Sequence, residues 1–351
     1  MNKNRTLEKL AFGTADVATI VPKFIVPTVE DVARHKTVVS QFFTPINDFL
    51  GKGKQIELPK FEDNITVTSG VGENTTISAS SFSYDATTVN ISKFGIRVEF
   101  NKEALQTATR DLLKDALYLA GKDYANEMDL RAETAMLGLS AGTITSWAGG
   151  TLGTVTVGQS PIVSITSVGA GTIDSIDYYD GKVLLASSVS AGTVTFTYSN
   201  NRYTKDSTNK GTLTLSDILN LKDSMSTDST IEPDVLLVST GDMTNLSTDS
   251  AFQNLFCCNS NKEYNCEVGS VLGIRVVSSG ILPRGVAVLV DSERVGYDIT
   301  TRKLTGYVDN KPEFDSVYYH LWAEKEYSMF DTLSVGLITN LATGAYSASD
   351  L

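Results

Sequence analysis

The sequence predicts an α+β fold, because patterns typical of strands and of helices occupy separate stretches of the chain. Residues 52–100 have the character of strands, and residues 101–139 repeat apolar side chains at helical spacing. Residues 212–339 mix short helices with apolar strands. At 351 residues the chain is long enough for two or three domains.

Residues 1–50 predict an N-terminal arm that contains one short helix. Thr28 and Asp31 resemble a capping box, and apolar residues recur at helical spacing from Val29 to Phe43. Prolines on both sides disfavour helical geometry in the residues that precede them. The flanks of this helix should therefore be extended.

Residues 51–100 predict a long two-stranded hairpin. Its strands are expected at 55–61 and 87–100, and the stretch between them is mostly Ser, Thr, Asn and Gly. Gly51 and Gly53 are expected to form a hinge before the first strand. Because an isolated two-stranded ribbon is only marginally stable in water, we expect the hairpin to lie on another subunit. The candidate contact residues are the apolar ones: Ile56, Leu58, Phe61, Phe82, Val89 and Ile91.

Residues 101–139 predict one long helix of roughly 55 Å. Asn101 is a favourable N-cap residue, and Glu127 and Arg131 are spaced for an ion pair. The apolar stripe keeps returning to a spacing of four, which favours packing along a sheet over a coiled coil. The stripe includes Leu105, Leu112, Tyr124 and Met128.

Residues 140–206 predict an inserted β-sandwich. The composition changes to Gly, Ser, Thr and Val, and four or five short strands lie between residues 154 and 198. Asp180-Gly181 is a strong hairpin-turn signal.

Residues 207–291 predict a mixed α/β unit, and residues 292–351 predict long returning strands. A helix should start at Thr214–Asp217, a buried strand should cover 235–238, and a second helix should cover 241–256. Strands are expected at 273–278, 286–291, 293–308, 316–328 and 333–339. In residues 317–323 both alternating faces carry large apolar groups, so this strand should be covered on both sides.

Charge and composition exclude several classes of protein. A net charge of −12 argues against a surface that grips phosphates, so any contact with nucleic acid should be loose and non-specific. No stretch has the length of a membrane span or of a secretory signal, which favours synthesis in the cytoplasm and no membrane partner. Cys257, Cys258 and Cys266 favour reduced thiols, with a disulfide from Cys266 as the alternative; a fourth zinc ligand is missing.

The sequence shows no pattern typical of catalysis, so we expect no enzyme, no cofactor and no metal. His35 and His320 lack partners at spacings that suggest a catalytic triad. Gly51-Lys-Gly-Lys54 precedes a strand and lacks the phosphate-loop pattern. Asp174, Asp177 and Asp180 do not have the spacing of an EF-hand.

The order of these elements resembles the major capsid protein of tailed viruses of bacteria or archaea, which has the Hong Kong 97 fold. The resemblance rests on the order and lengths of the elements, with Asn101-Lys-Glu-Ala-Leu105, the strand pair within 273–291 and Leu321–Tyr327 as supporting stretches. It implies an N-terminal arm (1–50), an E-loop (51–100), a P-domain helix (101–139), an A-domain (207–291), and P-domain strands with a last strand returning to the A-domain (292–351). The insertion 140–206 is similar to immunoglobulin-like modules of virions.

The resemblance also implies a function and partners. Copies of the chain would form pentamers and hexamers, close into an icosahedral head around double-stranded DNA, and assemble in the host cytoplasm into a virion. A separate scaffolding protein, a portal and a decoration protein are the implied partners. Some family members cross-link a hairpin lysine to a distant asparagine, but residues 62–92 contain no lysine. We therefore expect non-covalent contacts.

Two other functions stay open at this level. An encapsulin, a cellular shell with the same fold, would need a groove for a cargo peptide. An adhesin-like protein built around residues 140–201 would leave the hairpin and the long helix without partners.

Overall fold

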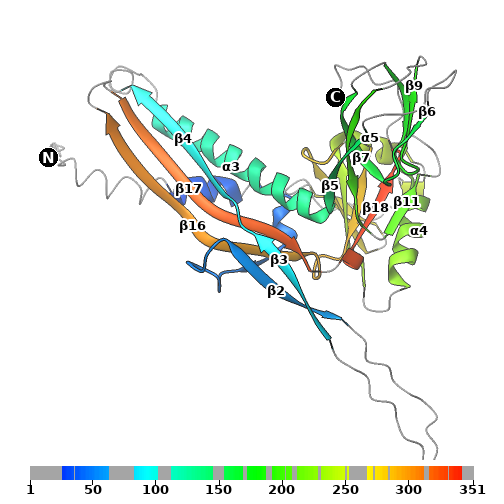
Figure 1. The fold of residues 1–351 in the computed structure, drawn as a ribbon, viewed down its shortest axis with the longest axis horizontal. Helices are drawn as coiled ribbons and strands as arrows, with labels where there is room; N and C mark the ends of the chain where they lie inside the picture. The colour runs from blue at the N-terminus through cyan, green and yellow to red at the C-terminus, as the bar shows by residue number, and fades with distance from the viewer. Residues whose placement is uncertain are drawn as a thin grey trace, which may run out of the picture.

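The computed structural model describes residues 26–34, 36–62, 83–101, 112–144, 154–168, 172–186, 192–201, 203–207, 212–227, 231–249, 251–252, 267–271, 273–283, 285–311, 316–330 and 332–341. Within these ranges the fold is α+β, with long strands and a long helix at one end and compact sheets at the other (Figure 1). No helix of the described ranges has the length and apolar character to cross a membrane.

A four-stranded sheet, with the order β1-β16-β17-β4, forms the elongated part of the molecule. Its strands are β1 (Thr44–Ile46), β16 (Gly296–Lys311), β17 (Ser316–Met329) and β4 (Lys93–Asn101). β1 is parallel to β16, and the other pairs are antiparallel. Phe94, Ile96, Val98 and Phe100 of β4 alternate onto the buried face, as the period of a strand requires.

The hairpin differs from its prediction. β2 (Gln55–Glu62) pairs with β3 (Ser83–Asn90), but the predicted strand 87–100 is two strands, because the chain leaves the hairpin at Ile91-Ser92 and enters β4 of the long sheet. The predicted strand 87–100 is therefore divided between two different sheets.

The long helix, α3 (Leu112–Met136), packs against β17 in the long sheet (Figure 1). The prediction that Asn101 caps the N-terminus of this helix is wrong, because Asn101 is the last residue of β4 and pairs with Ser316. At its other end the helix stops before Gly138, whose φ of +55° favours glycine. Leu139, the last residue of the predicted helix, already belongs to β5 (Leu139–Ile144).

A six-stranded sheet forms the α/β unit, in the order β11-β18-β15-β12-β14-β13. The strands are β11 (Tyr203–Asp206), β18 (Val335–Thr339), β15 (Ala287–Val290), β12 (Val235–Ser239), β14 (Ile274–Ser279) and β13 (Glu267–Val271). α4 (Leu215–Ser226) begins with the predicted capping box of Thr214 and Asp217, and α5 (Thr240–Thr248) follows β12. β12 is buried along its whole length, as its apolar sequence predicted.

The insertion contains two three-stranded sheets with a hydrophobic cluster formed by their own residues. One sheet is β5-β10-β7, with β10 (Val194–Ser199) and β7 (Ile162–Val168). The other is β6-β9-β8, with β6 (Thr154–Thr156), β9 (Lys182–Leu185) and β8 (Ile173–Asp177). The cluster runs from Val155 to Tyr198, with Phe196 and Ile162 fully buried. β5 had no counterpart in the prediction.

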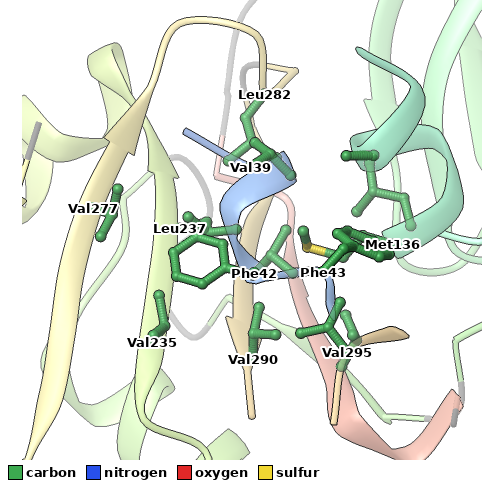
Figure 2. Close-up of a cluster of buried hydrophobic side chains, with 14 of the residues drawn as sticks. Val39, Phe42, Phe43, Met136, Val235, Leu237, Val277, Leu282, Val290 and Val295 are labelled. Atoms are coloured by element: carbon green, nitrogen blue, oxygen red, sulfur yellow. The ribbon is translucent and has the colours of Figure 1, made fainter. Parts of the chain in front are cut away.

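The described part of the N-terminal arm packs in two places: Val29 lies in a cluster with Ala120 of α3 and Leu304 of β16, and residues 39–43 lie in the core between α3 and the six-stranded sheet. Residues 26–34 are helical, and a short 3-10 helix, η1 (Ser40–Phe42), follows. Figure 2 shows Phe42 beside Leu237 and Phe43 beside Met136, so the arm contributes side chains to the core that joins the two parts of the chain. η3 (Thr332–Ser334) leads into β18.

Candidate subunit interface

The base of the hairpin is attached to its own chain. Ile56 and Leu58 on β2, Val89 on β3 and the following Ile91 are buried, and they pack with Ile299 of β16. Phe49 and Tyr297 complete this cluster. These predicted contact residues are therefore covered within one subunit, and their contact with another subunit stays a prediction.

For the other two predicted contact residues, Phe61 and Phe82, the contact with another subunit also stays a prediction. Phe61 is on β2 opposite Tyr84, but its side chain is outside the described part, and Phe82 lies outside the described residues.

Gly51 and Gly53, which are predicted to form a hinge, have the backbone geometry that glycine favours. Gly51 has a φ of +78° and Gly53 a φ of +85°, and a Cβ on either would meet no atom within 4 Å. The backbone conformation, and not a lack of space, is therefore the reason for glycine at both positions. The Gly51 N–H donates to the Thr301 carbonyl at 2.9 Å, which ties the hinge to β16.

A polar junction holds the exit of the hairpin. Arg131 of α3 donates to Glu127 at 2.7 Å, to Glu326 of β17 at 3.3 Å and to the hydroxyl of Ser92. Ser92 donates to Glu326 at 2.6 Å, and the Arg131 guanidinium lies 4.9 Å from the centre of the Phe94 ring. The sequence indicated the pair four residues apart, but it carried no signal for Ser92 or Glu326.

The predicted residues of the long helix have different environments. Tyr124 packs 5.7 Å from the Phe94 ring, and Met128 is buried in the central core. Burial, followed by Glu30 and Asp298, raises the pKa of Tyr124 above its usual range. Leu112 is the first residue of α3 but its side chain is outside the described part, and Leu105 lies outside the described residues.

The outer face of the long sheet carries aromatic rings next to cations. Lys93 lies 4.2 Å from the centre of the Trp322 ring, and Arg97 lies 4.1 Å from the centre of the Tyr318 ring. The rings of His320 and Trp322 are nearly parallel, with centroids 6.3 Å apart, and Tyr307 lies 6.2 Å from His320. His320 is therefore one member of an aromatic row.

This outer face corrects the prediction for β17. Tyr319, Leu321 and Ala323 are buried toward α3, but Trp322 is 36% exposed and Tyr307 on β16 is 59% exposed. Tyr318, on the same face, is buried at 9% exposure beside Arg97, so this second face is covered in part and is exposed at Trp322 and Tyr307. The exposed part is available to a partner.

Some of the residues considered for chemistry lie in the described part of the chain, and others lie outside it. In the part of the chain that the structure describes, no three His, Cys, Asp or Glu side chains are placed to hold a metal ion. His35 and the cysteines at 257, 258 and 266 lie outside the described residues.

Comparison with solved structures identifies the fold. A structure from Mycobacterium phage Bobi has 18% sequence identity and a TM-score of 0.53, and the match covers 87% of this chain and 90% of that chain. The mature capsid of bacteriophage PhiM1 matches with 11% identity and a TM-score of 0.53, covering 86% of each chain. The capsid of cyanophage P-SCSP1u matches with 10% identity and a TM-score of 0.54, covering 86% of this chain and 88% of that chain. No protein-family model and no curated protein matches the sequence. The chain has the fold of these phage capsid structures.

Proposed function

We propose that this chain is the major capsid protein of a tailed phage, a structural protein without catalytic activity. The observation that carries the proposal is its likeness to phage capsid structures over 86–87% of its length. The match covers most of the solved chains as well, so it involves the whole architecture and not a single motif.

The proposal assigns a role to each part of the fold. The hairpin β2-β3 would be the E-loop, α3 and the long sheet the P-domain, and the six-stranded sheet the A-domain. The β-sheets of residues 140–206 would be an inserted module, and the arm would be residues 1–50. The predicted boundaries at 50, 100, 139, 206 and 291 belong to this proposal.

We assign the main contact between subunits to the outer face of the long sheet. Trp322 and Tyr307 are exposed there in the single chain, and the hairpin extends away from the sheet that carries them (Figure 1). The end of a neighbour's hairpin, with Phe61 and Phe82, would cover these rings. An interface that buries about 1,500 Å² would gain roughly 30 kcal/mol before entropy costs.

The shell would consist of pentamers and hexamers around double-stranded DNA. With a net charge of −12 the chain would enclose the DNA without gripping its phosphates. A separate scaffolding protein, a portal and a decoration protein would complete assembly in the host cytoplasm, and the protein would reside in the virion.

Electron microscopy of the full-length chain tests this function. We expect closed, uniform shells when the chain is expressed alone or with the proteins encoded beside it. Monomers under all these conditions would contradict the proposal. Shells that contain a host enzyme in place of DNA, in the native source, would assign the chain to the encapsulins.

A further inference from the structure

The arm turn, residues 36–43, is attached to the long helix by one carboxylate. Asp129 of α3 accepts the backbone N–H of Val38 at 2.7 Å, that of Val39 at 3.1 Å and that of Ser40 at 2.9 Å. A carboxylate that accepts several backbone N–H groups is a strong, charge-assisted contact. Asp129 is 2% exposed, so water does not compete for these hydrogen bonds.

The arm turn fills the joint between the two parts of the molecule. Val39, Phe42 and Phe43 are buried in the core that also contains residues of α3 and of the six-stranded sheet (Figure 2). The Phe43 ring meets the Tyr327 ring edge-on, with centroids 5.1 Å apart. Release of the turn would therefore expose the core on both sides of this joint.

A second carboxyl group lies one helical turn from Asp129. Glu133 is 5% exposed, and its Oε2 has no hydrogen-bond partner among the described residues. Like charges four residues apart on a helix repel each other, and a buried charge without a partner is costly. Burial, and secondly the charge of Asp129, raises the pKa of Glu133 to about 8.

The cations near this region contact other groups. Lys325 of β17 pairs with Asp298 of β16 at 2.6 Å, and Arg131 of α3 pairs with Glu127 and Glu326. Arg275 of β14 lies 5.4 Å from the centre of the Phe42 ring. Asp129, which faces the arm turn from the same helix, is the charge that acts on Glu133. Burial also raises the pKa of Asp129 itself, while its hydrogen bonds with the arm turn lower it. Among the described residues, Tyr124 on α3 and Tyr327 on β17 are further titratable groups near the joint, and burial raises their pKa values; Lys36 of the arm turn is exposed.

We propose that Asp129 and Glu133 form a pH-sensitive latch, in which a protonated Glu133 lets Asp129 hold the arm turn and an ionised Glu133 loosens it. The direction of the pH effect on latch opening follows from the two states of Glu133. In the closed latch the carboxyl is buried and neutral, whereas in the open latch it reaches water and ionises at its ordinary pKa of 4.5. The free energy needed to open the latch therefore falls as the pH rises from 4.5 to about 8, and it is constant above that range.

Backbone hydrogen exchange of the full-length chain tests the latch. The exchange rates of the Val38, Val39 and Ser40 amides are measured in the natural protein and in Glu133→Gln between pH 5 and pH 9. At each pH the rate in the natural protein is divided by the rate in the variant. The ratio cancels the intrinsic pH dependence of exchange. We expect it to rise by up to about tenfold per pH unit below pH 8 and then to level off.

Asp123→Asn is the matched control, because Asp123 is an exposed carboxylate on the same helix. It should leave the exchange of the arm turn unchanged. A ratio that stays constant from pH 5 to pH 9, or that falls, would overturn the latch. If Glu133→Gln does not fold, the ¹³C chemical shift of the Glu133 carboxyl is followed against pH in the natural protein, which gives the pKa of that group. Titration at the ordinary pKa of 4.5 would overturn the latch, and titration well above it would support it.

Discussion

Gly95 shows how one residue shapes the outer face of the long sheet. A Cβ at this position would lie 2.3 Å from Cε3 of Trp322 and 2.7 Å from the Leu321 carbonyl oxygen. The Trp322 ring can therefore lie flat over β4 only because residue 95 has no side chain. The proposed contact surface depends on this glycine as much as on its aromatic rings.

Gly95→Ala should destabilise the protein by about 1–3 kcal/mol, because the Trp322 ring must leave its place over β4. Urea unfolding measures the change, and tryptophan fluorescence should shift with it. Gly280→Ala is the control, since a Cβ there meets nothing within 4 Å and no positive φ is involved. Equal stability losses for both variants would mean that the ring adjusts without cost.

Asn340 connects the insertion to the six-stranded sheet through a single side chain. Its Nδ2 donates to Asp177 at 3.0 Å and to Asp206 at 2.7 Å, and its Oδ1 accepts the Tyr178 N–H at 2.7 Å. Its φ of +63° is one that asparagine tolerates better than most residues. An amide is needed here, because both partners of its NH₂ group are acids.

Asn340→Asp should cost about 1–3 kcal/mol at pH 7, because a carboxylate replaces the donor that faces two carboxylates. A second change, Asp206→Asn, should recover part of the loss, because it places a donor opposite the new carboxylate. Thermal unfolding at pH 7 measures both variants, with the exposed Asn126→Asp on α3 as the control. No recovery in the double variant would rule out charge repulsion as the cause.

At the scale of elements, the junction around Arg131 determines how firmly the hairpin is attached. The guanidinium contacts α3, the hairpin exit and β17 through three different side chains. A planar group with several donors suits this arrangement, and an ammonium group does not reproduce it.

Arg131→Lys should therefore loosen the exit of the hairpin while the fold stays intact. We expect faster hydrogen exchange for residues 83–92 and a loss of stability of about 1 kcal/mol, since the ion pairs are only partly buried. Lys122→Ala, a change of an exposed cation on the same helix, should leave this exchange unchanged. Unchanged exchange in Arg131→Lys would show that the apolar contacts of the hairpin base are sufficient.

Local signals predicted many of the elements. The capping box at Thr214 and the apolar run at 235–238 depend on neighbours in sequence, and both elements were predicted near their observed positions. The break between β3 and β4 depends on which sheet each half joins, so residues 87–100 alone could not show it. The same reason explains Asn101, a residue that favours a helix N-terminus but pairs with Ser316 in a strand.

The candidate interface was harder to predict than the fold. The apolar pattern of the hairpin marked Ile56, Leu58, Val89 and Ile91 as buried, but alternation cannot distinguish burial within a subunit from burial between subunits. The Asp129 contact with the arm turn had no sequence signal, because its partners are backbone groups about ninety residues away.

For the whole molecule, the exposed rings of the long sheet should control assembly and not folding. Tyr307→Ser should leave the unfolding temperature of the subunit nearly unchanged, because the ring is 59% exposed, but it should reduce shell formation at least tenfold. Sedimentation and electron microscopy measure the shells. Tyr179→Ser in the insertion, where the ring is also exposed, is the control. Normal shells from Tyr307→Ser would place the contact elsewhere.

The position of the arm in the core has a consequence for how the chain is made. Residues 36–46 leave the ribosome early, yet Phe42 packs with Val290 and Val335, and Thr44 pairs with Tyr297 of β16. The site that receives the arm cannot exist until nearly the entire chain has been synthesised. During translation the arm therefore stays unpacked and accessible to chaperones and to other nascent copies. Its insertion into the core should be among the last and slowest steps of folding.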